Sequence, residues 1–322
     1  MEMSICTDVF GKIEFTEMLD KVKAYGINAI ELTAGGWGGC FFIPSARDLI
    51  DHEDKFKAFK NEIDKRGLTI SALNCSGNQL VNNAMGHAHS RTIHDTAVLA
   101  GKLGVKTLVM MSGLPEGAPG DVTPNWITST IAWPVYEGRR YIEDTLAYQW
   151  DVAAKWWKEF AAFAKENGVE KIAIEEFPNQ LVCNVRTLNK LREAVGTELA
   201  DMIGMNLDPS HLMIQGAEPI AAARELGDKI YYVHGKDARI ERYKCDVDGL
   251  TESLDVTEYT NRTWNYVAVG CGKDLQWWKE FFSVCHMMGY NGYVSLEMED
   301  LTMTVDAGLK TSIDALKATI SQ

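Results

Sequence analysis

At four places in the sequence, a short apolar run ends in a side chain that could bind a metal ion or transfer a proton. Three of these side chains are carboxylates and one is an imidazole: Glu175, Asp208, His234 and Glu297. Strands buried on both faces usually read as continuous apolar runs, so polar residues at their ends need an explanation. Taken singly, each of these residues has an ordinary structural explanation. Asp208, for example, precedes Pro209 and therefore also suits a helix N-cap. Their recurrence at successive runs favours one shared site.

The chemistry of such a shared site follows from its donor set. Three carboxylates in a small space raise one another's pKa values unless a cation lies among them. Three oxygen donors and one nitrogen donor, without a thiolate, favour a single divalent ion other than structural zinc. We therefore predict one Mn²⁺, with Mg²⁺ or Co²⁺ as alternatives. Such an ion keeps positions open for two adjacent oxygens of a substrate, as in a keto-sugar, and polarises its carbonyl.

The elements that position these residues alternate along the chain. We expect eight strands, each followed by a segment with helical spacing, which is typical of parallel strands joined by crossover helices. The expected strands are 3–6, 29–33, 69–74, 107–112, 171–176, 203–208, 230–234 and 293–297, and the clearest helices are 15–25, 55–66, 93–103, 151–167 and 185–195. This pattern predicts an α/β fold, a single (β/α)₈ TIM barrel over residues 1–322. An open doubly wound sheet is disfavoured because no G-x-G-x-x-G follows the first strand.

Two connections are long, 113–148 after the fourth strand and 238–275 after the seventh. In a barrel, both lie on the face where binding residues gather. The first is rich in Gly and Pro, which predicts an ordered but non-helical segment. Its Trp126 and Trp133 either stack on a ligand or anchor the segment to the barrel.

Composition excludes several classes of protein. The chain of 322 residues carries 32 Lys and Arg against 45 Asp and Glu, a net charge of −13, which disfavours a nucleic acid as partner. The seven cysteines are scattered and form no C-x-x-C pair, so neither a disulfide framework nor a thiolate zinc site is expected. No apolar stretch approaches the ~18 residues of a membrane span. We expect a cytoplasmic protein.

At the residues discussed above, the sequence resembles the xylose-isomerase-like sugar phosphate isomerase/epimerase superfamily, which includes inosose dehydratases and ketose 3-epimerases. The matching segments are Glu175 with Pro178, 207–211, 233–239, Gly270 with Gly272, and 289–297. The resemblance implies that Glu175, Asp208, His234 and Glu297 hold the metal and that Glu175, Glu297 and His211 are catalytic. It also implies that His211 and Arg239 contact substrate, with Lys236 and Asp237 orienting the site. We add Lys236 and the loop residue Trp133 as substrate-binding candidates.

The predicted reaction is proton abstraction next to the carbonyl of a keto-sugar, which gives an enediolate stabilised by the metal and Arg239. Return of the proton gives isomerisation or epimerisation, and loss of a β-substituent gives dehydration. The sequence is also similar to the larger subunits of bacterial C-glycoside deglycosidases, which implies β-elimination of an aromatic aglycone from a 3-keto C-glycoside and a small β-rich partner subunit. A homo- or hetero-oligomer is expected. A metal-dependent endonuclease and an inactive barrel scaffold remain as further alternatives.

Overall fold

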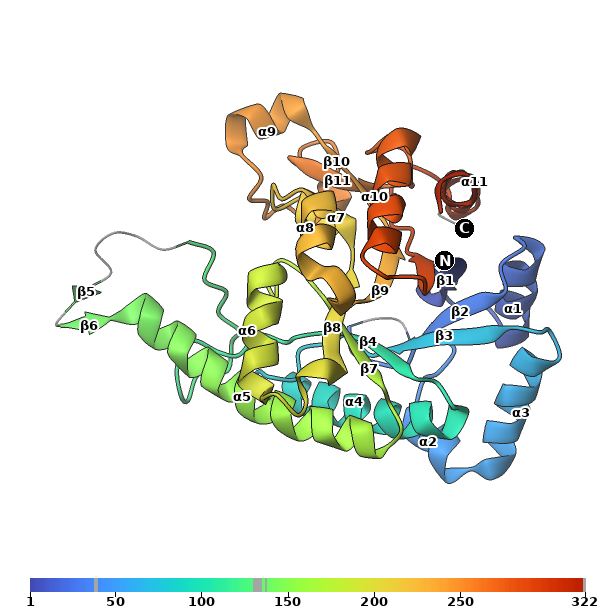
Figure 1. Ribbon diagram of the computed structural model, residues 1–322, viewed down its shortest axis with the longest axis horizontal. Coiled ribbons are helices and arrows are strands. Elements are labelled where there is room, and N and C mark those ends of the chain that lie inside the picture. The colour runs from blue at the N-terminus through green and yellow to red at the C-terminus, as the bar shows by residue number, and fades with distance from the viewer. Residues whose placement is uncertain (38–39, 130–134, 137, 321–322) are drawn as a thin grey trace.

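The protein is described by a computed structural model that covers residues 1–37, 40–129, 135–136 and 138–320. Eight parallel strands close into a barrel in the order β1-β12-β9-β8-β7-β4-β3-β2, so the predicted (β/α)₈ TIM barrel is confirmed (Figure 1). Their bounds are β1 (Glu2–Cys6), β2 (Ala29–Thr33), β3 (Thr69–Asn74), β4 (Thr107–Met111), β7 (Lys171–Glu175), β8 (Ile203–Leu207), β9 (Ile230–Gly235) and β12 (Tyr293–Leu296).

The strand order places the four candidate metal ligands on one rim. β7, β8, β9 and β12 are consecutive neighbours in the barrel. Glu175 is the last residue of β7, Asp208 follows β8, His234 is the last but one residue of β9, and Glu297 follows β12. Because all these strands run parallel, their carboxyl ends share the same edge, where binding sites of such barrels lie.

The described helices and short helical turns complete the fold. The helices are α1 (Phe15–Ala24), α2 (Ala46–Asp51), α3 (Glu53–Asp64), α4 (Ala84–Leu103), α5 (Tyr141–Glu166), α6 (Val185–Val195), α7 (Pro209–Met213), α8 (Pro219–Leu226), α9 (Arg242–Asp248), α10 (Leu275–Met287) and α11 (Val305–Thr319). The 3₁₀ turns are η1 (Thr7–Phe10), η2 (Ala200–Met202), η3 (Gly227–Lys229) and η4 (Val256–Glu258). None of the described helices is long and apolar enough to cross a membrane.

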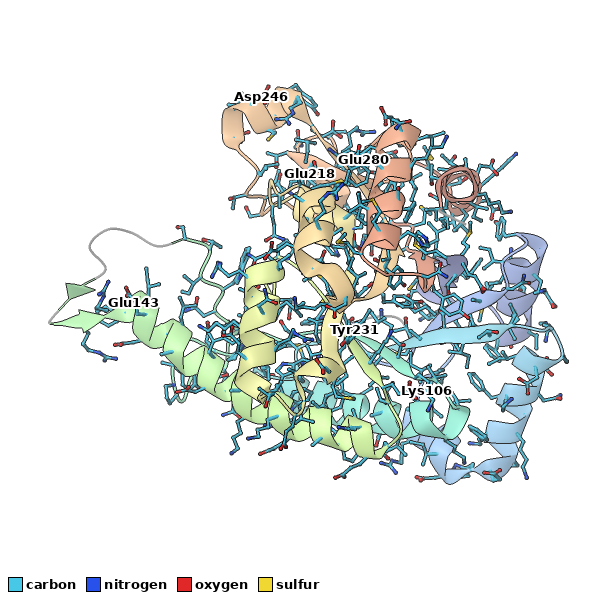
Figure 2. All side chains as sticks on the ribbon, viewed as in Figure 1. Lys106, Glu143, Glu218, Tyr231, Asp246 and Glu280 are labelled. Atoms are coloured by element: carbon cyan, nitrogen blue, oxygen red, sulfur yellow. The ribbon has the colours of Figure 1, made fainter. Side chains whose placement is uncertain are left out.

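The main core lies between the barrel and its helices. Trp157 and Phe160 of α5 and Trp278 and Phe281 of α10 are fully buried there. The indole of Trp157 also donates a hydrogen bond to the Ser112 carbonyl just after β4, at 3.0 Å. Charged side chains such as Glu143, Glu218 and Asp246 instead lie on the outer surface (Figure 2). Large aromatic residues thus fix the helices to the strands whose ends carry the site.

The connection after β4 differs from the prediction. Residues 113–148 were expected to be non-helical, but α5 begins at Tyr141, and a two-stranded ribbon of β5 (Val135–Tyr136) and β6 (Arg139–Arg140) precedes it. Glu143 and Asp144 lie in the first turn of α5, where acidic side chains interact favourably with the positive end of the helix dipole and stabilise the helix. α4 likewise begins at Ala84, earlier than expected, because the Asn83 side chain caps it by accepting the Gly86 N–H at 3.0 Å.

The connection after β9 contains structure that the sequence did not reveal. β10 (Asp237–Ile240) and β11 (Trp264–Val267) pair antiparallel, with α9 between them. These elements stand together on one side of the barrel (Figure 1). The ribbon carries Tyr266 to the rim on which the candidate ligands lie. This long connection is therefore part of the wall of the candidate site.

Candidate metal centre

Four side chains converge at the carboxyl ends of β7, β8, β9 and β12. One ligand atom from each of Glu175, Asp208, His234 and Glu297 lies within 4.8 Å of the other three. His234 Nδ1 is 3.4 Å from Glu175 Oε1, 3.7 Å from Asp208 Oδ2 and 3.2 Å from Glu297 Oε2. Oxygen and nitrogen ligands bind divalent ions at about 2.0 to 2.6 Å, so ligands of one ion lie up to about 5 Å apart. The cluster has the size of a single-ion site.

Two atoms of this cluster test whether a cation fits. Asp208 Oδ2 and His234 Nδ1 are buried and have no hydrogen-bond partner among the described residues. Buried polar atoms are almost always hydrogen-bonded, and an unpaired buried charge is costly. A divalent cation between these atoms satisfies both of them, and three carboxylates offset its charge. The donor set therefore fits a divalent ion.

Asp208 serves two purposes with its two oxygens. Its Oδ1 accepts the backbone N–H of Ser210 at 2.8 Å and the Ser210 hydroxyl at 2.6 Å, which caps α7. Its Oδ2 faces His234 and His211. The capping explanation and the metal explanation of this residue are thus compatible, because each uses a different oxygen.

A buried carboxylate orients His234. Glu31 on β2 is fully buried, and its Oε2 lies 3.1 Å from His234 Nε2. Asn74 donates a second hydrogen bond to Glu31 Oε1 at 2.8 Å. A metal-binding imidazole typically donates its other ring N–H to such a carboxylate, which sets the tautomer and the ring orientation. Glu31 therefore holds His234 with Nδ1 directed at the cluster.

The charges around His234 also affect its proton. Burial alone would lower the pKa of His234, but the nearby carboxylates of Glu31 and Glu297 raise it well above its usual value. Burial raises the pKa of Glu175, yet the hydrogen bond with His211 and the nearby His234 imidazole bring it well below its ordinary range. Lys236 and His234 likewise lower the pKa of Glu297 to about 2 against the effect of burial. Both glutamates are therefore ionised at neutral pH, the state that a base requires.

His211 and Lys236 border the same cluster. His211 Nε2 is 3.0 Å from Glu175 Oε1, and its Nδ1 is 2.9 Å from the Tyr266 hydroxyl. Lys236 is almost fully buried, and its Nζ lies 3.0 Å from Glu297 Oε2 and 2.7 Å from Glu299 Oε2. Its ammonium also lies 4.4 Å from the centre of the Tyr266 ring. The structure thus brings both predicted residues to the site.

A cavity of about 430 Å³, here called the rim cavity, opens onto the cluster. Glu175, Glu297, His211 and Lys236 line it. Further walls come from the ends of β1 to β4 and the loops after them, the loop after β7 and the β10–β11 ribbon: Asp8, Trp37, Asn74, Phe177, Gln180 and Tyr266. It therefore combines carboxylates, one ammonium, hydroxyl and amide groups with aromatic faces. Such a mixture suits a small polyhydroxylated molecule with an adjacent apolar group.

A family model described as a xylose isomerase-like TIM barrel matches residues 19–319. The chain belongs to this family. It is also 53% identical over 323 residues to the uncharacterized protein YfiH of Bacillus subtilis (strain 168), and that match covers 100% of both chains.

Solved structures share the fold at low sequence identity. The probable 3-DHS dehydratase AsbF of Bacillus anthracis matches with a TM-score of 0.67 and 16% identity over 98% of this chain and 99% of that one. The IolI protein, solved with a zinc atom, matches with a TM-score of 0.66 and 17% identity over 100% of both chains. A D-psicose 3-epimerase matches with a TM-score of 0.60 and 13% identity over 98% and 97%. These three proteins thus share the barrel fold with this chain.

Arg239 is not brought to the rim cavity of this family member. The residue was expected to contact substrate, but its guanidinium pairs with Glu241 Oε1 at 2.8 Å and it does not line the cavity. Side chains alternate between the faces of a strand. Lys236 faces the cluster, whereas Asp237 and Arg239 fall on the other face of the β10 segment. Trp133, the other predicted binding residue, lies outside the described residues.

Asp237 has a structural function beside the site. Its carboxylate accepts the backbone N–H groups of Gly270, Gly272 and Lys273 at 3.0 to 3.1 Å. A Cβ at Gly272 would lie 2.3 Å from the Ala238 carbonyl oxygen, so only glycine allows this approach. The predicted Gly270 and Gly272 pair therefore anchors the end of the β10–β11 ribbon, which carries Tyr266.

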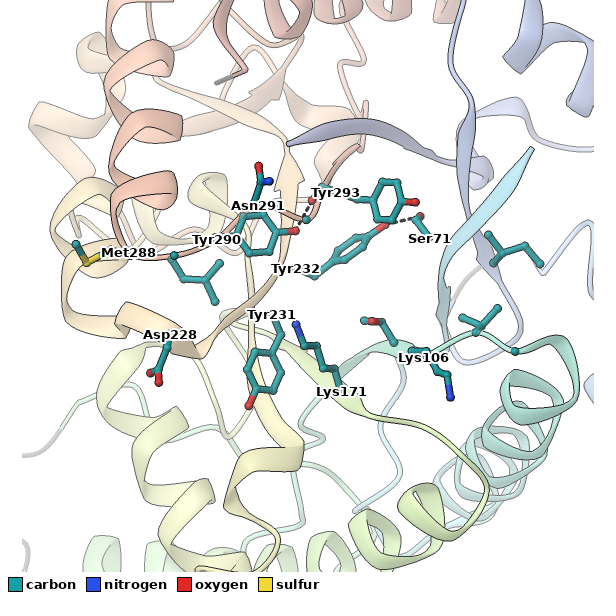
Figure 3. A pocket seen from close by; sticks show the side chains of 17 residues that line it. Ser71, Lys106, Lys171, Asp228, Tyr231, Tyr232, Met288, Tyr290, Asn291 and Tyr293 are labelled. Carbon is teal, nitrogen blue, oxygen red and sulfur yellow. Dashed lines mark hydrogen bonds between the residues drawn. The ribbon is translucent and has the colours of Figure 1, made fainter. Parts of the chain in front are cut away.

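The opposite end of the barrel also holds a cavity, about 560 Å³ in size, here called the floor cavity. Tyr231, Tyr232, Tyr290 and Tyr293 surround it at the amino ends of the strands (Figure 3). Tyr232 is tied to Ser71 by a hydrogen bond of 2.7 Å. No candidate metal cluster among the described residues lies here. Residues at this end of such barrels usually serve stability.

Sequence reasoning missed several residues around the cluster, of which Glu31 is the most important. It interrupts the apolar run 29–33, and an acidic residue inside a buried strand was a signal available from the sequence. Glu176 is a second such residue: it is fully buried and accepts the Asp208 backbone N–H at 3.1 Å. Burial and the nearby Asp208 raise the pKa of Glu176 well above its usual value. Tyr266 gave no signal, because its approach depends on the ribbon.

Proposed function

We propose that this protein is a divalent-metal-dependent isomerase, epimerase or dehydratase that acts on a keto-sugar by abstracting a proton next to the carbonyl. The observation that carries the proposal is the cluster of Glu175, Asp208, His234 and Glu297, with two buried ligand atoms that lack hydrogen-bond partners. The ion we propose is Mn²⁺, with Mg²⁺ or Co²⁺ as alternatives, because the donors are mainly carboxylate oxygens. When bound, such an ion supplies Lewis-acid polarisation of the carbonyl.

The residues of the chain supply the proton transfers. Glu175 and Glu297 both line the rim cavity and are both ionised at neutral pH, so one carboxylate takes the proton from the carbon next to the carbonyl. The same carboxylate then returns this proton to a different carbon, or the other carboxylate, after taking a proton from water, delivers one to the opposite face. An enediolate is the intermediate that joins these two steps. The ammonium of Lys236, 3.0 Å from Glu297, stabilises negative charge that develops nearby.

His211 and Tyr266 orient the groups that act on the substrate. When His211 Nε2 donates to Glu175, its Nδ1 accepts from the Tyr266 hydroxyl, so one tautomer satisfies both contacts. The Phe177 ring packs edge-on against His211, with their centroids 4.5 Å apart. This packing holds the imidazole beside the base. Names of structural neighbours, which include a 3-epimerase and a dehydratase, agree with this chemistry.

β-Elimination from a 3-keto C-glycoside is the second candidate. The observation that favours it is the aromatic lining of the rim cavity by Trp37 and Phe177, which offers stacking faces for an aromatic aglycone. A carbon-carbon glycosidic bond has no bridging oxygen to protonate, so deprotonation next to a ketone is the available route. A small β-rich partner subunit is part of this second proposal.

Deuterium exchange tests the proposed function directly. The purified protein, loaded with Mn²⁺, is incubated in D₂O with D-fructose, D-psicose, D-tagatose, 3-keto sugars and 3-keto C-glycosides, and the products are identified by mass. Incorporation of one deuterium, or loss of water, supports the isomerase, epimerase or dehydratase proposal, and release of the aglycone supports the second candidate. Absence of exchange and cleavage with every compound, in protein shown to hold one metal ion, contradicts both.

A further inference from the structure

Another cavity lies beside the rim cavity. It has a volume of about 370 Å³ and lies between the connection after β4, the first turns of α5, and α6; we call it the side cavity. Gln180 lines both the side cavity and the rim cavity. This residue is 4% exposed, and its Oε1 has no hydrogen-bond partner among the described residues. The two cavities therefore share a wall at Gln180.

The charge of the side cavity is opposite to that of the protein as a whole. The chain has 45 acidic residues against 32 Lys and Arg, yet no Asp or Glu is among the described residues that line this cavity. Arg186 and Lys190 line it, and their spacing of four places them on one face of α6. Neither is among the side chains that form ion pairs within the described part of the chain, as Lys21, Lys102 and Arg239 do. The cavity thus presents two positive charges that no carboxylate of the described residues pairs with.

The remaining walls are largely apolar and aromatic. Trp126, Leu146, Trp150 and Leu181 line the cavity. Lys190 Nζ lies 4.6 Å from the centre of the Trp150 ring, which holds this ammonium at the cavity wall. Trp150 is itself 8% exposed, so its position is fixed by packing. A ligand that fits these walls needs an apolar body as well as a negative charge.

We propose that the side cavity is a substrate subsite for an organic anion with a planar apolar body, of which an aromatic carboxylate is the simplest form. This inference rests on the proposed function, since the anionic group is taken to be a substituent of the sugar whose carbonyl lies in the rim cavity. Gln180 lies between the two cavities, in position to contact the bond that joins the sugar to its anionic substituent. Arg186 and Lys190 then bind the carboxylate by charge and hydrogen bonding.

Binding of a simple probe tests the charge and shape of the side cavity. Benzoate and its neutral analogue benzamide are titrated into the full-length protein and followed by ligand-observed NMR. Arg186→Met combined with Lys190→Met removes both charges at exposed positions of α6, and Lys158→Met, on an exposed position of α5 outside the cavity, is the matched control. We expect the double substitution to raise the Kd for benzoate at least about tenfold and to leave benzamide unchanged. Equal benzoate binding by the double variant and the control overturns the proposal.

A linked ligand tests whether the anion belongs to the substrate or to a separate effector. The probe is 4-carboxyphenyl β-D-glucoside, compared with benzoate and methyl β-D-glucoside. If the two cavities form one substrate site, the linked probe binds at least about tenfold more tightly than either part, because the second contact becomes intramolecular. We expect this gain in affinity to be lost in the double variant that carries Arg186→Met and Lys190→Met. A linked probe that binds no better than benzoate overturns the assignment to the substrate.

These binding measurements are separate from the chemistry. They require no turnover, so retained linked binding together with absent deuterium exchange rejects the proposed function and keeps the subsite. Glu175→Gln provides the converse control: it is expected to abolish exchange and to leave benzoate binding within about twofold of the unsubstituted protein. Loss of benzoate binding in Glu175→Gln would show that benzoate occupies the rim cavity and would overturn the subsite.

Discussion

Glu31 and His234 form a buried pair, with Glu31 Oε2 3.1 Å from His234 Nε2, although they lie on strands β2 and β9, which are not neighbours in the barrel. The pair reaches through the barrel interior, and both side chains are fully buried. The carboxylate holds one ring nitrogen, so the other faces Glu175, Asp208 and Glu297. The orientation of the candidate metal ligand is thus determined from the far side of the barrel.

The first prediction concerns this pair. Glu31→Gln keeps the size of the side chain but removes the acceptor charge that orients His234, so we expect Mn²⁺ affinity to fall about 10- to 100-fold. Isothermal titration calorimetry measures the change, and circular dichroism checks that the fold is retained. Glu225→Gln, at an exposed position of α8, is the matched control. Wild-type affinity in Glu31→Gln would show that the pair does not position the ligand.

A second prediction separates the two uses of Asp208. Asn is as good an N-cap as Asp, so Asp208→Asn keeps the cap of α7 while it removes the charge of the free oxygen. We expect it to lose measurable Mn²⁺ binding. Asp208→Ala also loses the cap, and it should unfold about 1 kcal/mol more easily than Asp208→Asn when both are denatured in chelator. Mn²⁺ binding by Asp208→Asn at wild-type strength would remove Asp208 from the ligand set.

Asp8 predicts a pH dependence of stability. Burial raises the pKa of Asp8 from 3.8 to about 6. Because the folded protein holds this proton more tightly than the unfolded chain does, the contribution of Asp8 to stability falls as the pH rises from about 4 to about 6. Asp8→Asn should therefore stabilise the chelator-treated protein at pH 7 by about 1 to 2 kcal/mol and have no such effect below pH 4. Urea denaturation at pH 7 and below pH 4 measures the free energy of unfolding of both proteins. An equal gain in stability from Asp8→Asn at the two pH values refutes the account.

The contrast between Lys236 and Arg239 gives a fourth prediction. Lys236 is buried in the rim cavity, whereas Arg239 pairs with Glu241 outside it. Lys236→Met should lower kcat/KM for deuterium exchange about 100-fold or more, as loss of a charge-stabilising donor does. Arg239→Ala should change it less than about threefold. A large loss of activity in Arg239→Ala would mean that its side chain leaves Glu241 to reach the substrate.

Much of the barrel could be predicted from the sequence because its signals are local. Apolar β-branched runs separated by helical spacing located all eight strands to within one or two residues. The order of a closed barrel then follows from chain order, and this order brings Glu175, Asp208, His234 and Glu297 to one rim. Helix N-termini were less predictable: α4 and α5 both begin earlier than expected, since caps and first-turn charges extended them.

The remainder depends on contacts between distant segments. Whether Arg239 faces the cavity depends on its face of the β10–β11 ribbon, which could not be read from residues 238–275 because the ribbon itself was not foreseen. The contact of Glu31 with His234 joins residues 203 positions apart. Tyr266 reaches His211 only because the ribbon folds back over the rim. Such pairings are properties of the packed barrel rather than of any local pattern.

Anomalous scattering from crystals grown with Mn²⁺ tests the central claim most directly. Data collected above and below the manganese absorption edge locate the ion without reference to activity. We predict one strong anomalous peak, from an ion within bonding distance of Glu175, Asp208, His234 and Glu297. Glu31 should lie on the far side of the His234 ring. A peak elsewhere, or a fully ordered rim without any peak at saturating Mn²⁺, would contradict the account.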